Sequence, residues 1–246
     1  MGLFSLFGGG KHEEREAKRI RDLAKKSQEK YGDAAGRVRA LEMLREIGSP
    51  QAIAALLQRF NVKTEPSITD REEKEYTVSL LAGLGEDALD PLMDFIRRSD
   101  NVAWAVRCLE ELVEEEELVR RLTELLAKIA MEYSRDPEKK IVLINRLAAA
   151  VDPTVVDAIL PLLQDASDEV RTATLSNLVG QGDAAVATPI AECLLSAESP
   201  RVQAASAEAL ATLAAPIDES VDAEALTKKL PAGFTLGGDR VVRKKA

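Results

Sequence analysis

Residues 168–195 read DEVRTATLSNLVGQGDAAVATPIAECLL, and residues 199–216 read SPRVQAASAEALATLAAP, so one pattern returns about thirty residues later. The corresponding positions are Val170 with Val202, Thr174 with Ser206, and Leu178 with Leu210. In each stretch a small residue stands four positions before a leucine, which is the spacing of one face of a helix. This self-similarity predicts a chain built from repeated helical hairpins.

The same frame recurs along most of the chain, with intervals between 28 and 40 residues. Its leucines are Leu44, Leu84, Leu112, Leu147, Leu178 and Leu210. A short polar turn and a second apolar helix follow most of them. One helix pair of this length cannot bury its own apolar stripe, whereas stacked pairs share a continuous core. We therefore predict an all-α fold: an α-solenoid of about six stacked helical hairpins, with a charged N-terminal helix and a small C-terminal helix and hairpin tail.

Composition and charge agree with a helical repeat and argue against nucleic acid. Of the 246 residues 46% are hydrophobic but only 4% aromatic, so leucine and alanine supply most of the packing. The net charge of -9 divides into +3 for residues 1–30, -17 for residues 31–227 and +5 for residues 228–246. Because an acidic body repels phosphates, we expect no nucleic-acid partner.

The rare residue types exclude several kinds of chemistry. His12 is the only histidine, so histidine-based metal sites and Ser-His-Asp or Cys-His machinery lack their parts. Cys108 and Cys193 lie in apolar helical surroundings, which predicts buried, reduced thiols. We find no secretory leader and no membrane-spanning run. The expectation is a cytoplasmic protein with no catalytic residue, no cofactor and no metal.

Two stretches resemble bacterial HEAT-like repeats of the short, phycobilin-lyase-like type. They are residues 168–178 and residues 36–54, GRVRALEMLREIGSPQAIA. The resemblance implies a repeat array over residues 33–214. Two departures from the pattern are the polar insertion NVKTEPSITDREEKE at residues 61–75 and the glutamate-rich unit at residues 110–126, which has no glycine turn.

The resemblance also implies that the second helices of the pairs line the surface where ligands bind. By register, the exposed positions there are Gln58, Arg59, Asp90, Asp94, Arg97, Arg98, Arg120, Arg121, Glu124 and Asp157. Charges spaced by one helical turn suit a protein partner, and ordinary solvated helix is the alternative. The leading hypothesis is a non-catalytic interaction module or scaffold that binds a protein partner on this concave surface or on the acidic surface of the solenoid.

A second hypothesis is enzymatic, because some short HEAT-like proteins are bilin lyases and others are metal-dependent hydroxylases or alkyl-base DNA glycosylases. The hydroxylases require repeated His-Glu pairs, and this chain has only His12 with Glu13. The glycosylases require a basic face with aromatics, whereas the lone Trp104 falls in a first helix as an expected core residue. The residue types do not exclude a bilin lyase, so this alternative is kept.

The N-terminus supports a third hypothesis. Residues 1–10, MGLFSLFGGG, read as a flexible apolar and glycine-rich start before a charged capping helix at residues 11–32. Phe4, Leu6 and Phe7 suit shallow insertion into a membrane surface, which would make the protein a peripheral adaptor, or docking in the groove of a partner. A disordered start without function is the alternative.

Residues 215–246 are expected to form a C-terminal capping helix and a basic tail. Ser220 or Asp222 is a candidate N-cap for a helix through Leu230, and FTLGGDRVV predicts a hairpin around Gly237 and Gly238. Disorder of this tail is the alternative. The glutamates of residues 110–117 form a solvated face or a docking patch, and the basic tail at residues 240–245 is one candidate to occupy it.

Overall fold

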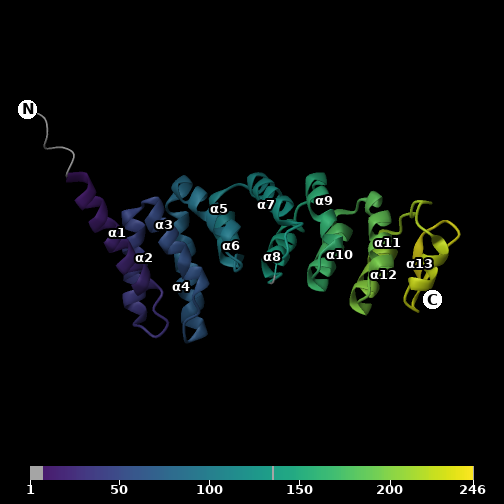
Figure 1. Ribbon diagram of the computed structural model, residues 1–246, viewed down its shortest axis with the longest axis horizontal. Helices are drawn as coiled ribbons and strands as arrows, with labels where there is room; N and C mark the ends of the chain where they lie inside the picture. The colour runs from purple at the N-terminus through teal and green to yellow at the C-terminus, as the bar shows by residue number, and fades with distance from the viewer. Residues whose placement is uncertain (1–7, 135, 246) are drawn as a thin grey trace, which may run out of the picture. The chain divides into compact units, whose positions relative to one another are not determined.

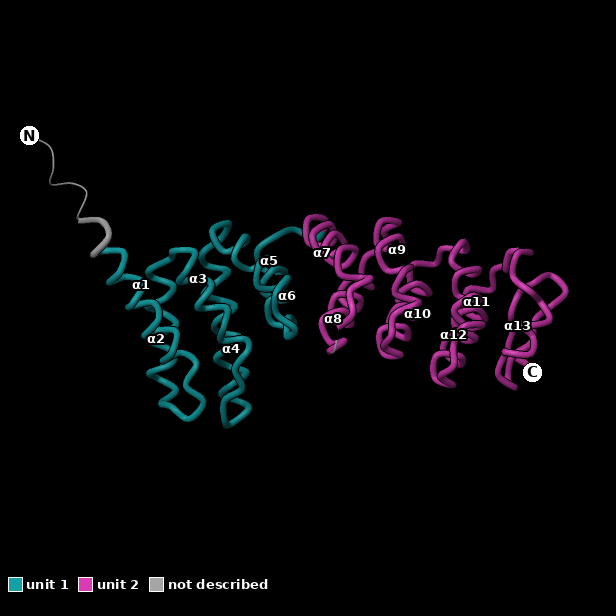
Figure 2. The backbone as a smooth tube through the Cα atoms, in the orientation of Figure 1, with its two compact units in different colours: residues 1–115 teal, residues 116–246 magenta. Residues whose placement is uncertain are grey.

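The computed structural model describes residues 8–134 and 136–245, and it is an all-α solenoid of helical hairpins, as predicted (Figure 1). Phe4, Leu6 and Phe7, the predicted membrane contacts, lie outside the described residues. The chain divides into two compact units, residues 1–115 and residues 116–246 (Figure 2). The repeat pattern in the sequence does not mark this division.

The elements follow one another as helix pairs. Unit 1 contains α1 (Gly8–Ser27), α2 (Ala34–Ile47), α3 (Pro50–Leu57), η1 (Gln58–Asn61), α4 (Ser67–Ala82), η2 (Gly85–Ala88), α5 (Leu89–Arg98) and α6 (Ala103–Leu112). Helix α7 (Glu115–Ile129) begins at the last residue of unit 1. Unit 2 continues with α8 (Glu138–Leu147), α9 (Pro153–Ile159), η3 (Leu160–Gln164), α10 (Asp168–Gln181), η4 (Ala184–Val186), α11 (Ala187–Ser196), α12 (Pro200–Leu213), α13 (Ala223–Lys229), β1 (Phe234–Leu236) and β2 (Val242–Lys244).

Each unit has two layers of helices. In unit 1 the first helices α2, α4 and α6 pack in succession, and the second helices α3 and α5 pack beside each other. In unit 2 the first helices are α8, α10 and α12, and η3, α11 and α13 form the second layer. Leucines such as Leu41, Leu56, Leu92, Leu178 and Leu194 are buried between the layers. The charged helix α1 covers α2 and α3 at the start of the stack.

Local sequence signals set the ends of the helices. The Asp33 carboxylate accepts hydrogen bonds from the backbone N–H groups of Ala35 and Gly36, and Ser167 caps α10 in the same manner. Gly48 and Gly182 end α2 and α10 with φ of 63° and 70°, in the left-handed region that favours glycine. These signals explain why α2 and α10, in the two stretches with the strongest family resemblance, begin and end where they do.

The leucine predicted to mark the repeat is the wrong one in two repeats. Leu84 lies beyond the end of α4 and is half-buried, and Leu112 is half-buried at the end of α6. The buried leucines of these helices are Leu81 and Leu109, each three residues earlier. A shift of three residues keeps a side chain on nearly the same helix face, so periodicity alone does not distinguish the two registers.

With this corrected register, a polar side chain stands seven residues before the buried leucine in five of the six first helices. These residues are Arg37, Lys74, Lys140, Arg171 and Gln203, and Val102 takes the position in α6. Each of the five donates a hydrogen bond to a carboxylate or a backbone carbonyl. The repeat therefore encodes a polar contact as well as an apolar core.

The structure can be compared with the predictions for the N-terminal start and for the C-terminal helix and hairpin. Helix α1 begins at Gly8, so the predicted flexible start does not extend to residue 10. At the other end, Asp222 caps α13 and the predicted hairpin is present, with Leu236 opposite Val242.

The basic tail makes its polar contacts within unit 2. The Arg240 guanidinium donates to the carbonyls of Ile217 and Val221, at 2.7 and 2.6 Å. Arg243 pairs with Asp239, and Lys244 Nζ lies 2.6 Å from Glu208 Oε1 on α12. The tail therefore packs on the last helix pair of unit 2.

Candidate functional site

A groove of about 850 Å³ lies between the second helices α3 and α5 of unit 1. Its apolar lining comes from both helices and includes Pro50, Ala54 and Leu57 of α3, and Met93 and Phe95 of α5. Pro50 and Ala54 are exposed, Met93 is half-buried, and Leu57 and Phe95 are buried. Because the lining is built from two adjacent helices, the groove depends on how one repeat packs on the next.

The rim of the groove is charged and asymmetric. Glu86, Asp87 and Asp90 stand at its acidic end and are exposed, and none of them has an ion pair or hydrogen-bond partner among the described side chains. At the other end Asp94 pairs with Arg97, and its Oδ2 lies 3.6 Å from Arg98 Nη2. One end therefore carries uncompensated negative charge, and at the other the carboxylate is neutralised.

Two phenylalanines hold the floor of the groove. The rings of Phe60, in η1, and Phe95, in α5, meet edge to face, with centroids 6.2 Å apart and an interplanar angle of 73°. The amide of Asn101 donates to the Phe60 carbonyl at 3.3 Å and ties η1 to the loop after α5. The groove is therefore a preformed feature of the packing between the two helices.

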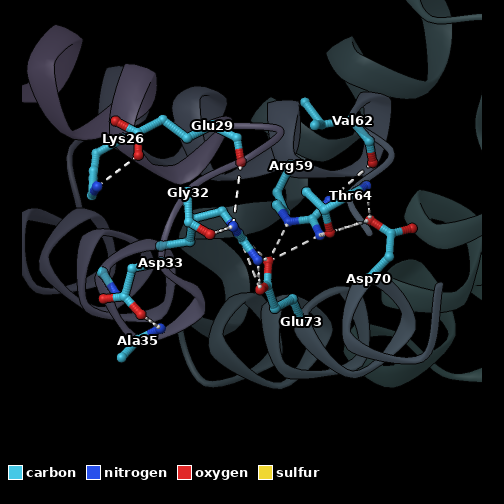
Figure 3. Close-up of polar contacts among 12 residues, drawn as sticks. Lys26, Glu29, Gly32, Asp33, Ala35, Arg59, Val62, Thr64, Asp70 and Glu73 are labelled. Atoms are coloured by element: carbon cyan, nitrogen blue, oxygen red, sulfur yellow. Dashed lines mark hydrogen bonds and ion pairs between the residues drawn. The ribbon is translucent and has the colours of Figure 1, made fainter. Parts of the chain in front are cut away.

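Arg59 is the one predicted surface residue that the structure buries, so its assignment to the exposed face is wrong. Its guanidinium lies 2.7 Å from Asp70 Oδ1 and 3.0 Å from Glu73 Oε2, and its Nη1 donates to the Val62 carbonyl at 2.9 Å (Figure 3). These partners come from the polar insertion at residues 61–75 and its continuation into α4. The insertion folds inward over Arg59, so this side chain cannot reach a partner.

Glu73 is shared between two buried arginines. Its Oε1 lies 2.6 Å from Arg37 Nη2, and Arg37 also donates to the Gly32 carbonyl at 2.6 Å. Lys74 completes the cluster, with its Nζ 2.8 Å from Asp70 Oδ2. We call Arg37, Arg59, Asp70, Glu73 and Lys74 the buried ion network. It joins α2, η1 and α4, and through η1 it supports the floor of the groove.

The network makes stability depend on pH through Asp70. Burial alone would raise the pKa of this carboxyl, but hydrogen bonds from Lys74, Arg59 and the Thr64 backbone outweigh that effect and lower the pKa to about 2. A folded-state pKa below the unfolded one contributes stability that is present above the unfolded pKa and is lost as the pH falls toward the folded one.

We therefore expect the free energy of unfolding to fall by about 1 kcal/mol more for the wild-type chain than for Asp70→Asn between about pH 5 and about pH 3. Urea denaturation followed by the fluorescence of Trp104, the single tryptophan, measures this in unit 1. Parallel pH profiles for the two proteins would show that Asp70 is not the group that titrates.

The remaining predicted site residues lie elsewhere. On α7, Arg120 pairs with Glu117 and Glu124 at 2.7 and 2.5 Å, and Arg121 pairs with Glu117 at 2.6 Å. The hydrogen bond from Arg120, joined by one from Arg121, lowers the pKa of Glu117 to about 2. Asp157 is exposed on α9. The structure thus brings Gln58, Asp90, Asp94, Arg97 and Arg98 to one groove and leaves Arg120, Arg121, Glu124 and Asp157 outside it.

Sequence reasoning missed the apolar half of the site and the network beneath it. Pro50, Ala54 and Met93 give no signal by themselves, because each is an ordinary helix residue. Asp70 and Glu73 did carry a signal: they stand three residues apart in a polar insertion, so a helix there places both carboxylates on one face. The spacing does not identify Arg59 as their partner, because that depends on how the insertion folds.

Three further observations concern chemistry and the membrane. Cys108 and Cys193 are free and buried, as predicted, and burial with the nearby Glu111 raises the pKa of the Cys108 thiol to about 12. Trp104 is half-buried and not a core residue, and Arg107 stacks on its ring at 5.5 Å. Within residues 8–134 and 136–245 we find no cluster of three metal-ligating side chains, and no helix there is both long and apolar enough to span a bilayer.

A match to one family model agrees with the repeat architecture. Residues 123–211 match the family model described as HEAT repeats, which includes the stretch of strongest resemblance. No curated protein matches the chain. Human deoxyhypusine hydroxylase in complex with glycerol is similar at 17% identity and a TM-score of 0.34, over 89% of this chain and 90% of the other. An engineered protein is similar at 16% identity and a TM-score of 0.38, over 79% of this chain and 96% of the other.

Proposed function

Because the chain is a HEAT-like repeat protein, we propose that it is a non-catalytic interaction module of the cytoplasm that holds a protein partner in the groove between α3 and α5. The observation that carries the proposal is the groove itself: an apolar floor from two helices, fixed by the Phe60 and Phe95 contact, within a charged rim. An apolar centre surrounded by polar residues is the usual composition of a protein interface.

The choice of a module over an enzyme is supported by the residue inventory. HEAT repeats in general serve as interaction scaffolds, because stacked hairpins create extended surfaces. The chain has one histidine, His12, and the thiol of Cys108 is held protonated by its raised pKa. A reducing compartment is consistent with two free cysteines.

Filling the groove should weaken partner binding by about tenfold or more without affecting the fold. Ala54 is exposed in the groove, so Ala54→Arg places a long side chain there with little effect on the core. We expect the immobilised wild-type chain to retain a protein from native lysate that Ala54→Arg does not retain. The same protein, once purified, should bind the variant at least about tenfold more weakly in isothermal titration, a loss of about 1.4 kcal/mol.

The matched control is Ala204→Arg, an exposed alanine on α12 of unit 2. It adds the same side chain and charge outside the groove and should bind as the wild-type chain does. Equal affinity of the recovered protein for the wild-type chain and for Ala54→Arg would refute the proposed binding site.

A further inference from the structure

We propose that the occupant of the groove is a basic amphipathic helix of the partner protein, with lysine or arginine facing Glu86, Asp87 and Asp90. This inference rests on the proposed function and adds the chemical class of the partner. It follows from the charge at the acidic end, from the dimensions of the groove and from its apolar floor.

The charge at the acidic end calls for a cationic partner. Glu86, Asp87 and Asp90 lie within five residues, are exposed, and have no cation beside them among the described side chains. Asp94 differs, because Arg97 and Arg98 already compensate it. Counted over the whole lining, four carboxylates face two guanidinium groups. Cations brought to the acidic end relieve the repulsion among the three carboxylates, whereas an anion there would increase it.

Helices α9 and α11 of unit 2 carry less negative charge than the groove. In unit 2 the second helices α9 and α11 each carry one acidic residue, Asp157 and Glu192. On α7 the arginines Arg120 and Arg121 neutralise Glu117. The acidic end of the groove thus combines uncompensated carboxylates with an adjoining apolar floor, which an ordinary solvated helix face lacks.

The dimensions and the floor fit a helix. Helix α5 has ten residues, so the groove beside it extends about 15 Å, or about three turns of a bound helix. Such a helix presents apolar residues at intervals of three and four, and these would pack against Pro50, Ala54 and Met93 on the two walls. The flexible thioether of Met93 adapts to side chains of different shapes. A helix with apolar residues on one face and lysines beside them would pack on the apolar floor and pair with the carboxylates of the acidic end.

The test uses a synthetic helical peptide and the full chain. The probe is a fluorescent peptide of about fourteen residues, roughly four turns, with leucines on one face and lysines on the others. A matched peptide carries glutamate in place of every lysine. Fluorescence anisotropy should show binding of the lysine peptide and none of the glutamate peptide. The affinity should weaken as salt is added, since the charge contribution is screened.

Two charge-matched variants distinguish the groove from general electrostatic attraction. Glu86→Gln/Asp87→Asn/Asp90→Asn should weaken the lysine peptide by about tenfold or more, as should Ala54→Arg. Asp157→Asn/Glu192→Gln/Glu219→Gln removes the same charge from exposed positions of unit 2 and should leave the affinity within about twofold of wild type. All these side chains are on the surface, and circular dichroism verifies that each variant is folded.

The outcomes separate this inference from the proposed function. Equal weakening by both triple variants, or equal binding of both peptides, overturns the inference. A lysate partner that distinguishes Ala54→Arg from wild type, combined with no binding of the lysine peptide, overturns it and leaves the proposed function standing. If the lysate partner and the lysine peptide each bind Ala54→Arg as well as they bind the wild-type chain, the inference and the proposed function are both refuted. A wild-type dimer that Ala54→Arg dissociates, measured by light scattering, would assign the groove to a second copy and also overturn the inference.

Discussion

Glu73→Gln is expected to lower the free energy of unfolding by about 3 to 5 kcal/mol, the range found when one partner of a buried ion pair is removed. Glu73 lies between Arg37 and Arg59, and all three side chains are buried. Glutamine keeps the shape but not the charge, so two guanidinium groups stay in the core with one fewer counter-ion. Urea denaturation monitored by Trp104 fluorescence measures the loss in unit 1.

A matched control lies two residues along the same helix. Glu75 is partly exposed and pairs with Arg71 at 3.0 Å, so Glu75→Gln should cost no more than about 1 kcal/mol. If Glu73→Gln does not fold, an apolar replacement of the cluster, Arg37→Met/Arg59→Met/Glu73→Leu, should recover most of the stability because no unpaired charge is left. Equal effects of Glu73→Gln and Glu75→Gln would contradict the role of the network.

The network also has a consequence for the groove. Arg59 directly precedes Phe60, whose ring contacts Phe95 under the groove. Loosening the network should therefore release η1 before it affects unit 2. Hydrogen exchange of Glu73→Gln should show faster exchange in α2, η1 and α4, with α10 and α12 unchanged, as expected when stability is local to a repeat.

Lys140→Met is expected to cost about 2 to 4 kcal/mol in unit 2, for a related reason. Lys140 is buried, and its Nζ donates to the carbonyls of Ala130 and Glu132 at 3.0 and 2.7 Å and pairs with Asp165 at 2.7 Å. Methionine fills the space but leaves a half-buried carboxylate without its cation and two carbonyls without a donor. The polar repeat position thus joins the segment after α7 to α8 and to the loop after η3.

Urea denaturation followed by far-ultraviolet circular dichroism measures the loss, and hydrogen exchange of residues 130–134 locates it. Lys128→Met is the control, because Lys128 is an exposed lysine two residues before this segment. It should be within about 0.5 kcal/mol of wild type. Unchanged exchange of residues 130–134 in Lys140→Met would show that the lysine does not hold this segment in place.

Short-range signals explain which parts of the fold were predictable. Asp222 caps α13 through the N–H groups of Glu224 and Ala225, which are two and three residues away, and the hairpin around Gly237 and Gly238 closes within a few residues. The leucine spacing likewise depends on helix geometry alone. The error at Leu84 and Leu112 shows the limit of periodicity. A spacing of three residues fits one helix face, so the pattern alone does not show that α4 ends before Leu84 and that Leu81 is the buried leucine.

The candidate site also contains residues that were predictable from the sequence and residues that were not. Asp90, Asp94, Arg97 and Arg98 were predictable as exposed residues, because α5 has one apolar and one charged face and every position follows from its register. The burial of Arg59 was not predictable, since its exposure depends on whether Asp70 and Glu73 fold over it. Helical register does not predict the contacts made by a connecting segment.

By itself, the sequence determined the class of the fold, the repeat and the charges available on each helix, because these depend on residues three to four positions apart. Only the tertiary structure decided that Arg59 is internal and that Ala54 and Met93, about forty residues apart, share one groove. The physical reason is that burial and concavity arise from contacts between neighbouring repeats, whose partners no local pattern identifies.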